Sequence, residues 1–353
     1  MAEPLQIESI VSNSSPILGK SHPIMIIASD QQKYFLKRQV VKFIDKKNGS
    51  PIWLNEDAVF FQEWVVSQLA RKLEIPTPET VLIDIDKETL EYMPELRFQY
   101  HISEGRYFAT KLISDNDSEV TRLAHTLLQQ IQMKMPYART QWNALMKKII
   151  NVDDIPKIIG LDLYTLNYDR FSNVGNVLLQ KAGSNRYLIA IDFGHCFEGP
   201  FWVYPQPVPK NMNKVSLLHQ NLIDFSDQTA VILLAHQIIC KYNQVKDNTH
   251  LEMGIVFDSL IRLIDFSGIN PFEEIVSKIE AITEQELVSL LQSVPDEWVV
   301  APGIQQQEYK AFLLRQKWML RPIINEFADY KQFPTISGRE ALTWQAEPNM
   351  NIQ

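Results

Sequence analysis

Three polar side chains in the middle of the chain could together hold a divalent cation. Asp169 lies in a polar loop, Asn176 immediately precedes an apolar run, and Asp192 immediately follows a second apolar run. The residues between the two runs are turn formers centred on Gly183, so the two runs predict a β-hairpin. Antiparallel pairing would bring Asn176 and Asp192 together, with Asp169 within reach. Carboxylate and amide oxygens are hard ligands suited to Mg²⁺.

The order of these residues is typical of phosphoryl-transfer sites. A loop Asp, an Asn a few residues later, a strand-turn-strand and Asp-Phe-Gly form the catalytic layout of protein-kinase-like phosphotransferases. The chain carries Asp-Phe-Gly literally, at residues 192–194. That tripeptide alone is weak evidence, because Asp favours surface turns for reasons of its own. Together with the loop and the strands, the pattern favours a phosphotransferase.

The same stretch resembles the HipA-like kinases, in particular the HipA-like kinase-domain proteins of bacteria. That family typically carries Asn-Thr-Asp-Arg-His-x-Gly-Asn-Leu-Leu followed by Ile-Asp-His/Phe-Gly-His-x-Phe. The counterparts here are Asn-Tyr-Asp-Arg-Phe at 167–171, Gly-Asn-Val-Leu at 175–178 and Ile-Asp-Phe-Gly-His-Cys-Phe at 191–197. The resemblance covers most of the chain and is strongest at 55–80 and 161–199.

The resemblance implies ATP and Mg²⁺ as cofactors, with Asp169 orienting or accepting the proton of the acceptor hydroxyl. It also implies Asn176 and Asp192 as metal ligands. Two departures from the family pattern are present. Phe171 stands where the family usually has His, and the loop from Asp169 to Asn176 is two residues longer, which makes Asn173 a competitor for the role of Asn176.

Two residues nearer the N-terminus are expected to engage phosphate. An apolar run at 23–27 and a strand-like run at 33–37 flank a turn and predict a second hairpin. The family has a similar strand ending in lysine, which implies that Lys37 contacts the α and β phosphates. Aligning the family's helix on Leu-Ala-Arg at 69–71 places its glutamate on Glu63, the expected partner of Lys37. Glu63 lies in an apolar stretch, where an unpaired carboxylate would be costly; Glu56 is its competitor.

The turn at residues 12–21 is the expected nucleotide-covering loop. Gly19 and Ser21 are its candidate phosphate contacts. The sequence has no Gly-x-Gly-x-x-Gly and no Walker lysine motif, so this expectation rests on the position of the turn before the hairpin.

The spacing of apolar residues predicts the helices and strands that would position these side chains. Residues 55–73 predict a helix with Asn55 as N-cap, because apolar residues recur four apart on one face. Strands are predicted at 81–86 and 106–113. Spacing of three and four predicts further helices at 118–133, 140–151, 155–166, 216–223, 228–242, 251–264, 271–282, 284–293 and 308–328. The stretch 201–213 predicts an irregular loop. Ser216, just beyond it, is the one candidate for a regulatory phosphorylation site, and its alternative role is to cap a helix.

Composition excludes several classes of protein. The net charge of −8 argues against general nucleic-acid binding. No apolar run is long enough to span a membrane. With two cysteines the chain has no disulfide framework, and a reducing, cytoplasmic setting is expected. His195 beside Cys196 could suggest a nucleophile pair, but packing beneath the metal site is the favoured interpretation.

These observations predict an α+β, bilobal protein-kinase-like fold with an N-lobe at 1–113, a helical C-lobe at 114–335 and a tail at 336–353. The predicted function is ATP- and Mg²⁺-dependent phosphoryl transfer to a hydroxyl, with a protein serine or threonine as acceptor. The alternatives are a pseudokinase that binds nucleotide or acts as a scaffold, and a lipid or small-molecule kinase.

Overall fold

The structure is a computed structural model. It describes residues 3–11, 23–44, 49–114, 126–127, 129–130, 133–203, 227–242, 253–336 and 338–345. Gly19, Ser21 and Ser216 lie outside these residues, as do the predicted helix at 216–223 and most of the one at 118–133.

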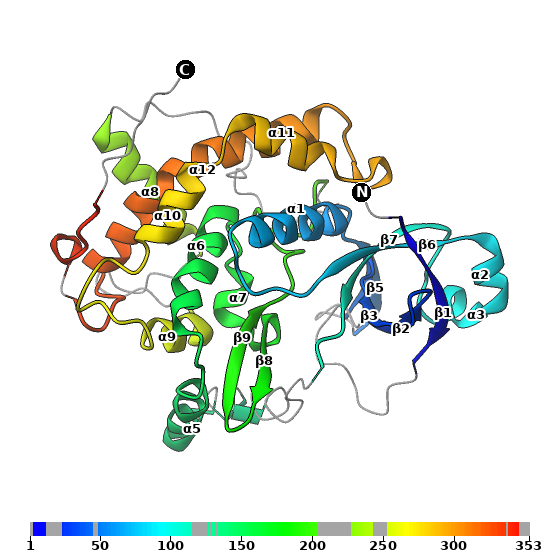
Figure 1. Cartoon of the computed structure of the whole chain (residues 1–353), viewed down its shortest axis with the longest axis horizontal. Helices are drawn as coiled ribbons and strands as arrows, with labels where there is room; N and C mark the ends of the chain where they lie inside the picture. Colours follow the sequence, from blue (N-terminus) through cyan, green and yellow to red (C-terminus); the bar gives the residue numbers. More distant parts are fainter. Residues whose placement is uncertain are drawn as a thin grey trace.

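The N-terminal part is built on a closed barrel of five strands (Figure 1). Its strands, in order around the barrel, are β1 (Leu5–Ile10), β2 (Ile24–Ala28), β3 (Lys33–Leu36), β7 (Gly105–Lys111) and β6 (Thr80–Ile85). Alternate residues of β2 are buried, as expected for a strand with one face on the core. β2 and β3 pair antiparallel, which confirms the predicted hairpin. The strands predicted at 81–86 and 106–113 are β6 and β7.

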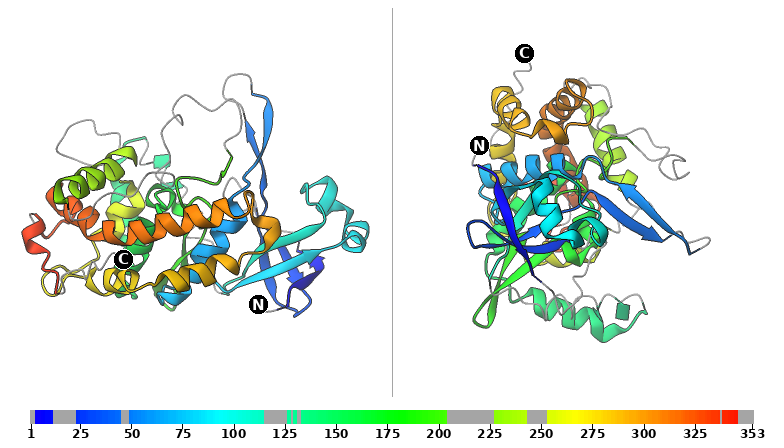
Figure 2. Two further views of the ribbon diagram at one scale, coloured as in Figure 1. Left: turned by 90° about the horizontal axis from the view of Figure 1, so that it is seen from above. Right: turned by 90° about the vertical axis from the view of Figure 1, so that its right-hand side faces the viewer.

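A second, two-stranded sheet joins the barrel to the first long helix. β4 (Val40–Ile44) and β5 (Pro51–Asn55) pair antiparallel, and Figure 2 shows this blue ribbon projecting away from the barrel. The prediction that Asn55 caps a helix was wrong, because Asn55 ends β5 and pairs with Val40. Helix α1 (Val59–Lys72) begins four residues later with Ala58 at its N-cap and no side-chain cap. β-branched and aromatic residues in β5 outweighed the capping signal.

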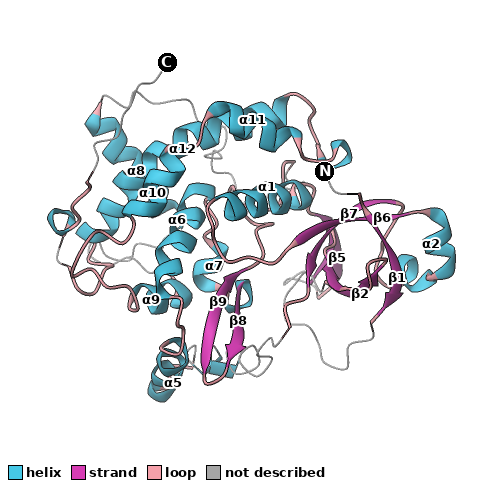
Figure 3. Cartoon of the chain, viewed as in Figure 1, coloured by secondary structure: helices cyan, strands magenta, loops and turns pink. Residues whose placement is uncertain are grey.

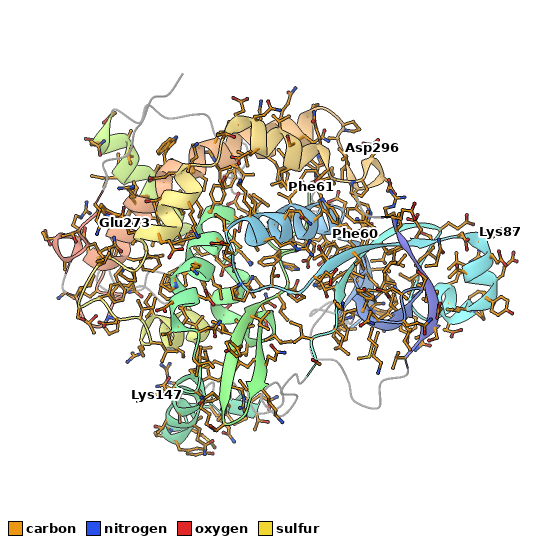
Figure 4. The ribbon with its side chains drawn as sticks, viewed as in Figure 1. Phe60, Phe61, Lys87, Lys147, Glu273 and Asp296 are labelled. Carbon is orange, nitrogen blue, oxygen red and sulfur yellow. The ribbon has the colours of Figure 1, made fainter. Side chains whose placement is uncertain are left out.

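Helix α1 lies between the barrel and the C-terminal helices α11 and α12 (Figure 1). Both of its faces are therefore buried, and Phe60 and Phe61, labelled in Figure 4, are each almost fully inaccessible. Two short helices, α2 (Lys87–Tyr92) and α3 (Pro94–Phe98), lie between β6 and β7 at the outer end of the barrel.

The described residues after β7 are mainly helical, and among them β8 (Val177–Ala182) and β9 (Asn185–Ala190) form a hairpin (Figure 3). The α-helices of this part are α5 (Pro136–Met146), α6 (Ile155–Thr165), α7 (Asp169–Ser172), α8 (Gln228–Tyr242), α9 (Ile255–Ile261), α10 (Glu273–Glu280), α11 (Glu284–Gln292) and α12 (Ile304–Asp329). Its 3-10 turns are η1 (Val152–Asp154), η2 (Val174–Asn176), η4 (Asp296–Trp298) and η5 (Arg339–Ala341).

The predicted helices at 155–166, 228–242 and 284–293 are confirmed closely, and the mixed α and β content is confirmed. Several boundaries differ from prediction, among them those of the helix predicted at 251–264, which is α9 and spans only Ile255–Ile261. The helix predicted at 140–151 begins at Pro136, a residue suited to the first helical turn. α12 begins four residues earlier than predicted and continues through Pro322. Within the described residues, no helix combines the length and apolarity that crossing a membrane requires.

Candidate active site

The open end of the β8–β9 hairpin brings two predicted ligands together. Val177 pairs with Ala190, which places the residues just outside the two strands side by side. The Ile191 amide donates to the Asn176 carbonyl at 3.4 Å. Asn176 and Asp192, sixteen positions apart in the chain, therefore leave the hairpin at the same place, as the strand pattern predicted.

A buried ion pair holds this end of the hairpin in place. The Nε of Arg170 lies 2.9 Å from Oδ2 of Asp162 on α6, and both side chains are 1% exposed. The Nη1 of Arg170 donates to the carbonyl of Asn176 and, at 2.6 Å, to that of Ile191. Burial raises the pKa of Asp162 to about 6, against the opposing effect of the Arg170 charge. One guanidinium thus ties α6 to both strand ends.

Asp162 was missed in the sequence. The available signal was a single carboxylate in the largely apolar helix 155–166, where an unpaired charge would be costly. That argument applies to Asp162 in the same way as to Glu63.

Asp169 and Asn176 are in direct contact. The amide nitrogen of Asn176 donates to Oδ2 of Asp169 at 2.7 Å, and Asn176 is buried. Its amide oxygen remains as the atom that could meet a cation. The competitor, Asn173, is exposed and uses its oxygen to accept the Gly175 amide at 3.0 Å, as the cap of η2. Of the two, Asn176 has the geometry that suits a ligand.

Lys37 lies between two carboxylates. Its Nζ is 2.8 Å from Oε1 of Glu63 on α1 and 2.9 Å from Oδ1 of Asp192. Burial opposes the charge of Lys37, but the two carboxylates together raise its pKa. Burial likewise opposes ionisation of Asp192, yet Lys37 lowers that pKa, whereas burial raises the pKa of Glu63. The competitor Glu56 instead lies 3.8 Å from His195.

The Asp-Phe-Gly tripeptide is attached to α1 by its backbone. The amide of Phe193 donates to Oε2 of Glu63 at 3.2 Å, so Glu63 contacts the tripeptide as well as the lysine. Asp192 has a φ of 64°, in the left-handed region. A Cβ on Gly194 would lie 2.5 Å from Cγ2 of Val59, so the backbone approaches the helix more closely than a side chain permits.

Two residues that raised questions in the sequence belong to the core. Phe171 is 2% exposed and packs on Phe257 of α9, with ring centroids 4.9 Å apart. The phenylalanine that stands here in place of the family's His is therefore a core residue. Cys196 is fully buried, and burial raises the pKa of its thiol well above the usual value. A buried, protonated thiol is not a nucleophile, which agrees with the packing interpretation.

The chemistry of these side chains fits a divalent cation. The oxygens of Asp192 and the amide oxygen of Asn176 are hard donors, and Lys37 supplies a fixed positive charge beside them. Lys37, Glu63 and Asp192 meet, and Asp169 and Asn176 meet at the adjoining end of the hairpin.

Comparison with known proteins gives one family match. The model of the HipA-like kinase family matches residues 7–137, which confirms the resemblance over this part and supports a phosphotransferase of kinase type. The matched part includes Lys37 and Glu63 and ends before Asp169. No curated protein matches the chain.

Two solved structures are similar at low identity. A proinflammatory kinase from Helicobacter pylori, CtkA, shares 10% identity with a TM-score of 0.43, covering 91% of this chain and 99% of that one. A MAP kinase from Leishmania major shares 11% identity with a TM-score of 0.23, covering 98% of this chain and 88% of that one. Scores this low do not establish a common fold.

Proposed function

We propose that this chain, whose residues 7–137 match the HipA-like kinase family, is a bilobal kinase that uses ATP and Mg²⁺ to phosphorylate a hydroxyl. The proposed acceptor is a serine or threonine of a protein. The observation that carries the proposal is the position of Lys37, held 2.8 Å from Glu63 and 2.9 Å from Asp192 at the open end of the β8–β9 hairpin.

Lys37 would neutralise the α and β phosphates as a point charge. Its backbone amide donates to the carbonyl of Phe108 at 2.9 Å, which fixes the end of β3 against β7. Glu63 is 1% exposed, and its Oε1 lies 2.8 Å from the ammonium of Lys37, so this ion pair would keep Lys37 directed at the site.

Asn176 and Asp192 would hold the cation. Lys37 contacts one carboxylate oxygen of Asp192, which leaves the other oxygen available as a ligand. Bound Mg²⁺ would neutralise charge on the transferring phosphoryl group. Arg170 would contribute by binding the carbonyl of Asn176 itself and that of Ile191, the residue before Asp192.

Asp169 would orient the acceptor hydroxyl and accept its proton. Asn176 donates to Oδ2 of this carboxylate, so Oδ1 would be the oxygen that accepts the proton of the acceptor hydroxyl. A general base needs hydrogen-bonding reach to the proton that it removes, and the contact with Asn176 fixes its direction.

The test is transfer from labelled ATP with Mg²⁺ to protein, peptide, lipid and small-molecule acceptors, with Asp169→Ala as the blank. We expect label on a protein or peptide from the unmodified chain and none from the variant. Thermal stabilisation by Mg²⁺-ATP without turnover would favour the nucleotide-binding alternative. The proposed function would be refuted if the chain neither transferred label to any acceptor nor bound nucleotide.

A further inference from the structure

Helix α12 carries a buried tyrosine, Tyr309, that packs against the segments forming the candidate site. Tyr309 is 1% exposed, and its ring centroid lies 4.7 Å from that of Phe61 and 4.7 Å from that of Phe197. It also stacks on Trp202 at 6.0 Å. Phe61 belongs to α1, whereas Phe197 and Trp202 belong to the segment after Asp-Phe-Gly. A single side chain from α12 therefore contacts both segments that bring a carboxylate to Lys37.

Hydrogen bonds run parallel to these ring contacts. The Nε2 of Gln62 donates to the hydroxyl of Tyr309 at 2.9 Å and to the carbonyl of Gly199 at 3.0 Å. Gln62 is 1% exposed and immediately precedes Glu63. The hydroxyl of Tyr309 thus contacts the residue beside the proposed lysine partner.

The N-terminus of α1 is joined to the same segment. The Ala58 amide donates to the carbonyl of Pro200 at 3.0 Å. The carboxylate of Asp57 accepts the amides of Trp202 at 2.6 Å and Val203 at 3.2 Å. Because α1 lacks a side-chain cap of its own, this segment supplies a partner for its first turn. α1 and residues 199–203 are therefore expected to move together.

A second group of contacts from the C-terminal part involves Phe60 and Trp64 of α1. The Nε1 of Trp298 donates to the carbonyl of Arg106 at 2.9 Å, and its ring packs on Phe60 at 5.3 Å. The Nε1 of Trp64 donates to Oγ of Ser293 at 2.9 Å. Asp296, labelled in Figure 4, begins the turn that carries Trp298. The C-terminal part therefore holds α1 against the barrel while Tyr309 holds it against residues 197–203.

We propose that Tyr309 is a positioning residue for phosphoryl transfer, acting through α1 and residues 197–203 on the contacts of Lys37 with Glu63 and Asp192. This inference rests on the proposed function. A displacement of about 1 Å can cost about 10²-fold in rate, even when the change lies away from the chemistry. Loss of the Tyr309 ring would loosen both supports of the lysine at once.

The test compares two leucine substitutions on the same helix. Tyr309→Leu removes the proposed contact, and Phe327→Leu removes an equally buried ring of α12 that packs on Phe257 and Phe333 instead. We expect both variants to lower Tm. Only Tyr309→Leu should lower kcat, by about tenfold or more, with a much smaller change in KM for ATP. Tyr309→Phe, which keeps the ring contacts, should recover most of kcat.

A second measurement does not require activity. Hydrogen exchange followed by mass spectrometry should show faster exchange in peptides covering 55–73 and 197–203 for Tyr309→Leu and unchanged exchange there for Phe327→Leu. Equal losses of kcat in the two leucine variants, or equal exchange in these peptides, would overturn the inference. If the unmodified chain transfers no phosphate, the proposed function fails, and the exchange result still decides whether Tyr309 positions these segments.

Discussion

The candidate site has two halves that differ in how far apart their residues lie in the sequence. Asp162, Asp169, Arg170 and Asn176 lie within fifteen positions and are joined by direct contacts. Lys37, Glu63 and Asp192 come from three distant segments, with 155 positions between the lysine and the aspartate.

The comparison teaches that the local half is stabilised by its own pairing, whereas the long-range half depends on the placement of α1. Arg170 needs only α6 and the hairpin to find its partners. The Lys37 cluster needs the barrel, α1, the segment after Asp-Phe-Gly and the C-terminal helices to be correctly packed. Substitutions in each half should therefore have different consequences for stability and activity.

The largest effect is expected where the two halves meet. Asp192→Asn removes a ligand charge and a partner of Lys37, so transfer should fall by at least about 10³-fold, a loss of several kcal/mol of charge stabilisation. The measurement is the initial rate of transfer from labelled ATP. Asp153→Asn, an exposed carboxylate outside the site, serves as control and should keep full activity.

The local half is tested by breaking its buried ion pair. Arg170→Met leaves Asp162 buried without its charge partner and should lower the free energy of unfolding by about 3–5 kcal/mol. Adding Asp162→Leu removes the stranded charge and should recover part of that loss. Urea denaturation of both single variants and the double variant measures the coupling. Strictly additive losses would mean that the pair does not act as a unit.

The long-range half is tested by pushing the tripeptide away from α1. In Gly194→Ala the new methyl would meet Val59 at 2.5 Å, so we expect a loss of about 1–3 kcal/mol in stability together with reduced transfer. Val59→Ala in the same chain should restore part of both by making room. Gly268→Ala, where no atom lies within 4 Å of the added methyl, is the matched control. Failure of Val59→Ala to relieve the defect would contradict the steric explanation.

The smallest effect is expected at the competing asparagine. Asn173→Ala removes a cap from the Gly175 amide and should cost about 1 kcal/mol while leaving most of the transfer activity. Asn176→Ala should instead eliminate most of the activity. Thermal unfolding and transfer rates measured on both variants decide between the two. Retained activity in Asn176→Ala with loss in Asn173→Ala would reverse the assignment.

Much of the architecture could be predicted from periodicity. The β8–β9 hairpin, the β2–β3 hairpin and helices such as α8 and α11 follow from local patterns of apolar and turn-forming residues. The β4–β5 ribbon was missed because Asn55 before two acidic residues resembles a helix start. Its strand character depends on pairing with residues 40–44, which the local pattern around Asn55 does not reveal.

Within the site, the role of Arg170 was not predicted although its motif was noticed. Its partners are a side chain on the preceding helix and two carbonyls, and backbone carbonyls carry no signal in a sequence. Tyr309 was missed for a related reason, because an aromatic residue in a long helix has the appearance of ordinary core.

By itself the sequence determined the hairpin and its polar ends, since strand pairing and turn formation depend on neighbouring residues. It also determined the chemical types available there, two carboxylates, an amide and a lysine. Only the tertiary structure decided that Lys37 contacts Glu63 and not Glu56, and that α12 supports the helix that carries Glu63. Those contacts join segments that are far apart in the chain. The burial of α1 on both faces decides which of its side chains meet Lys37 and which meet α12.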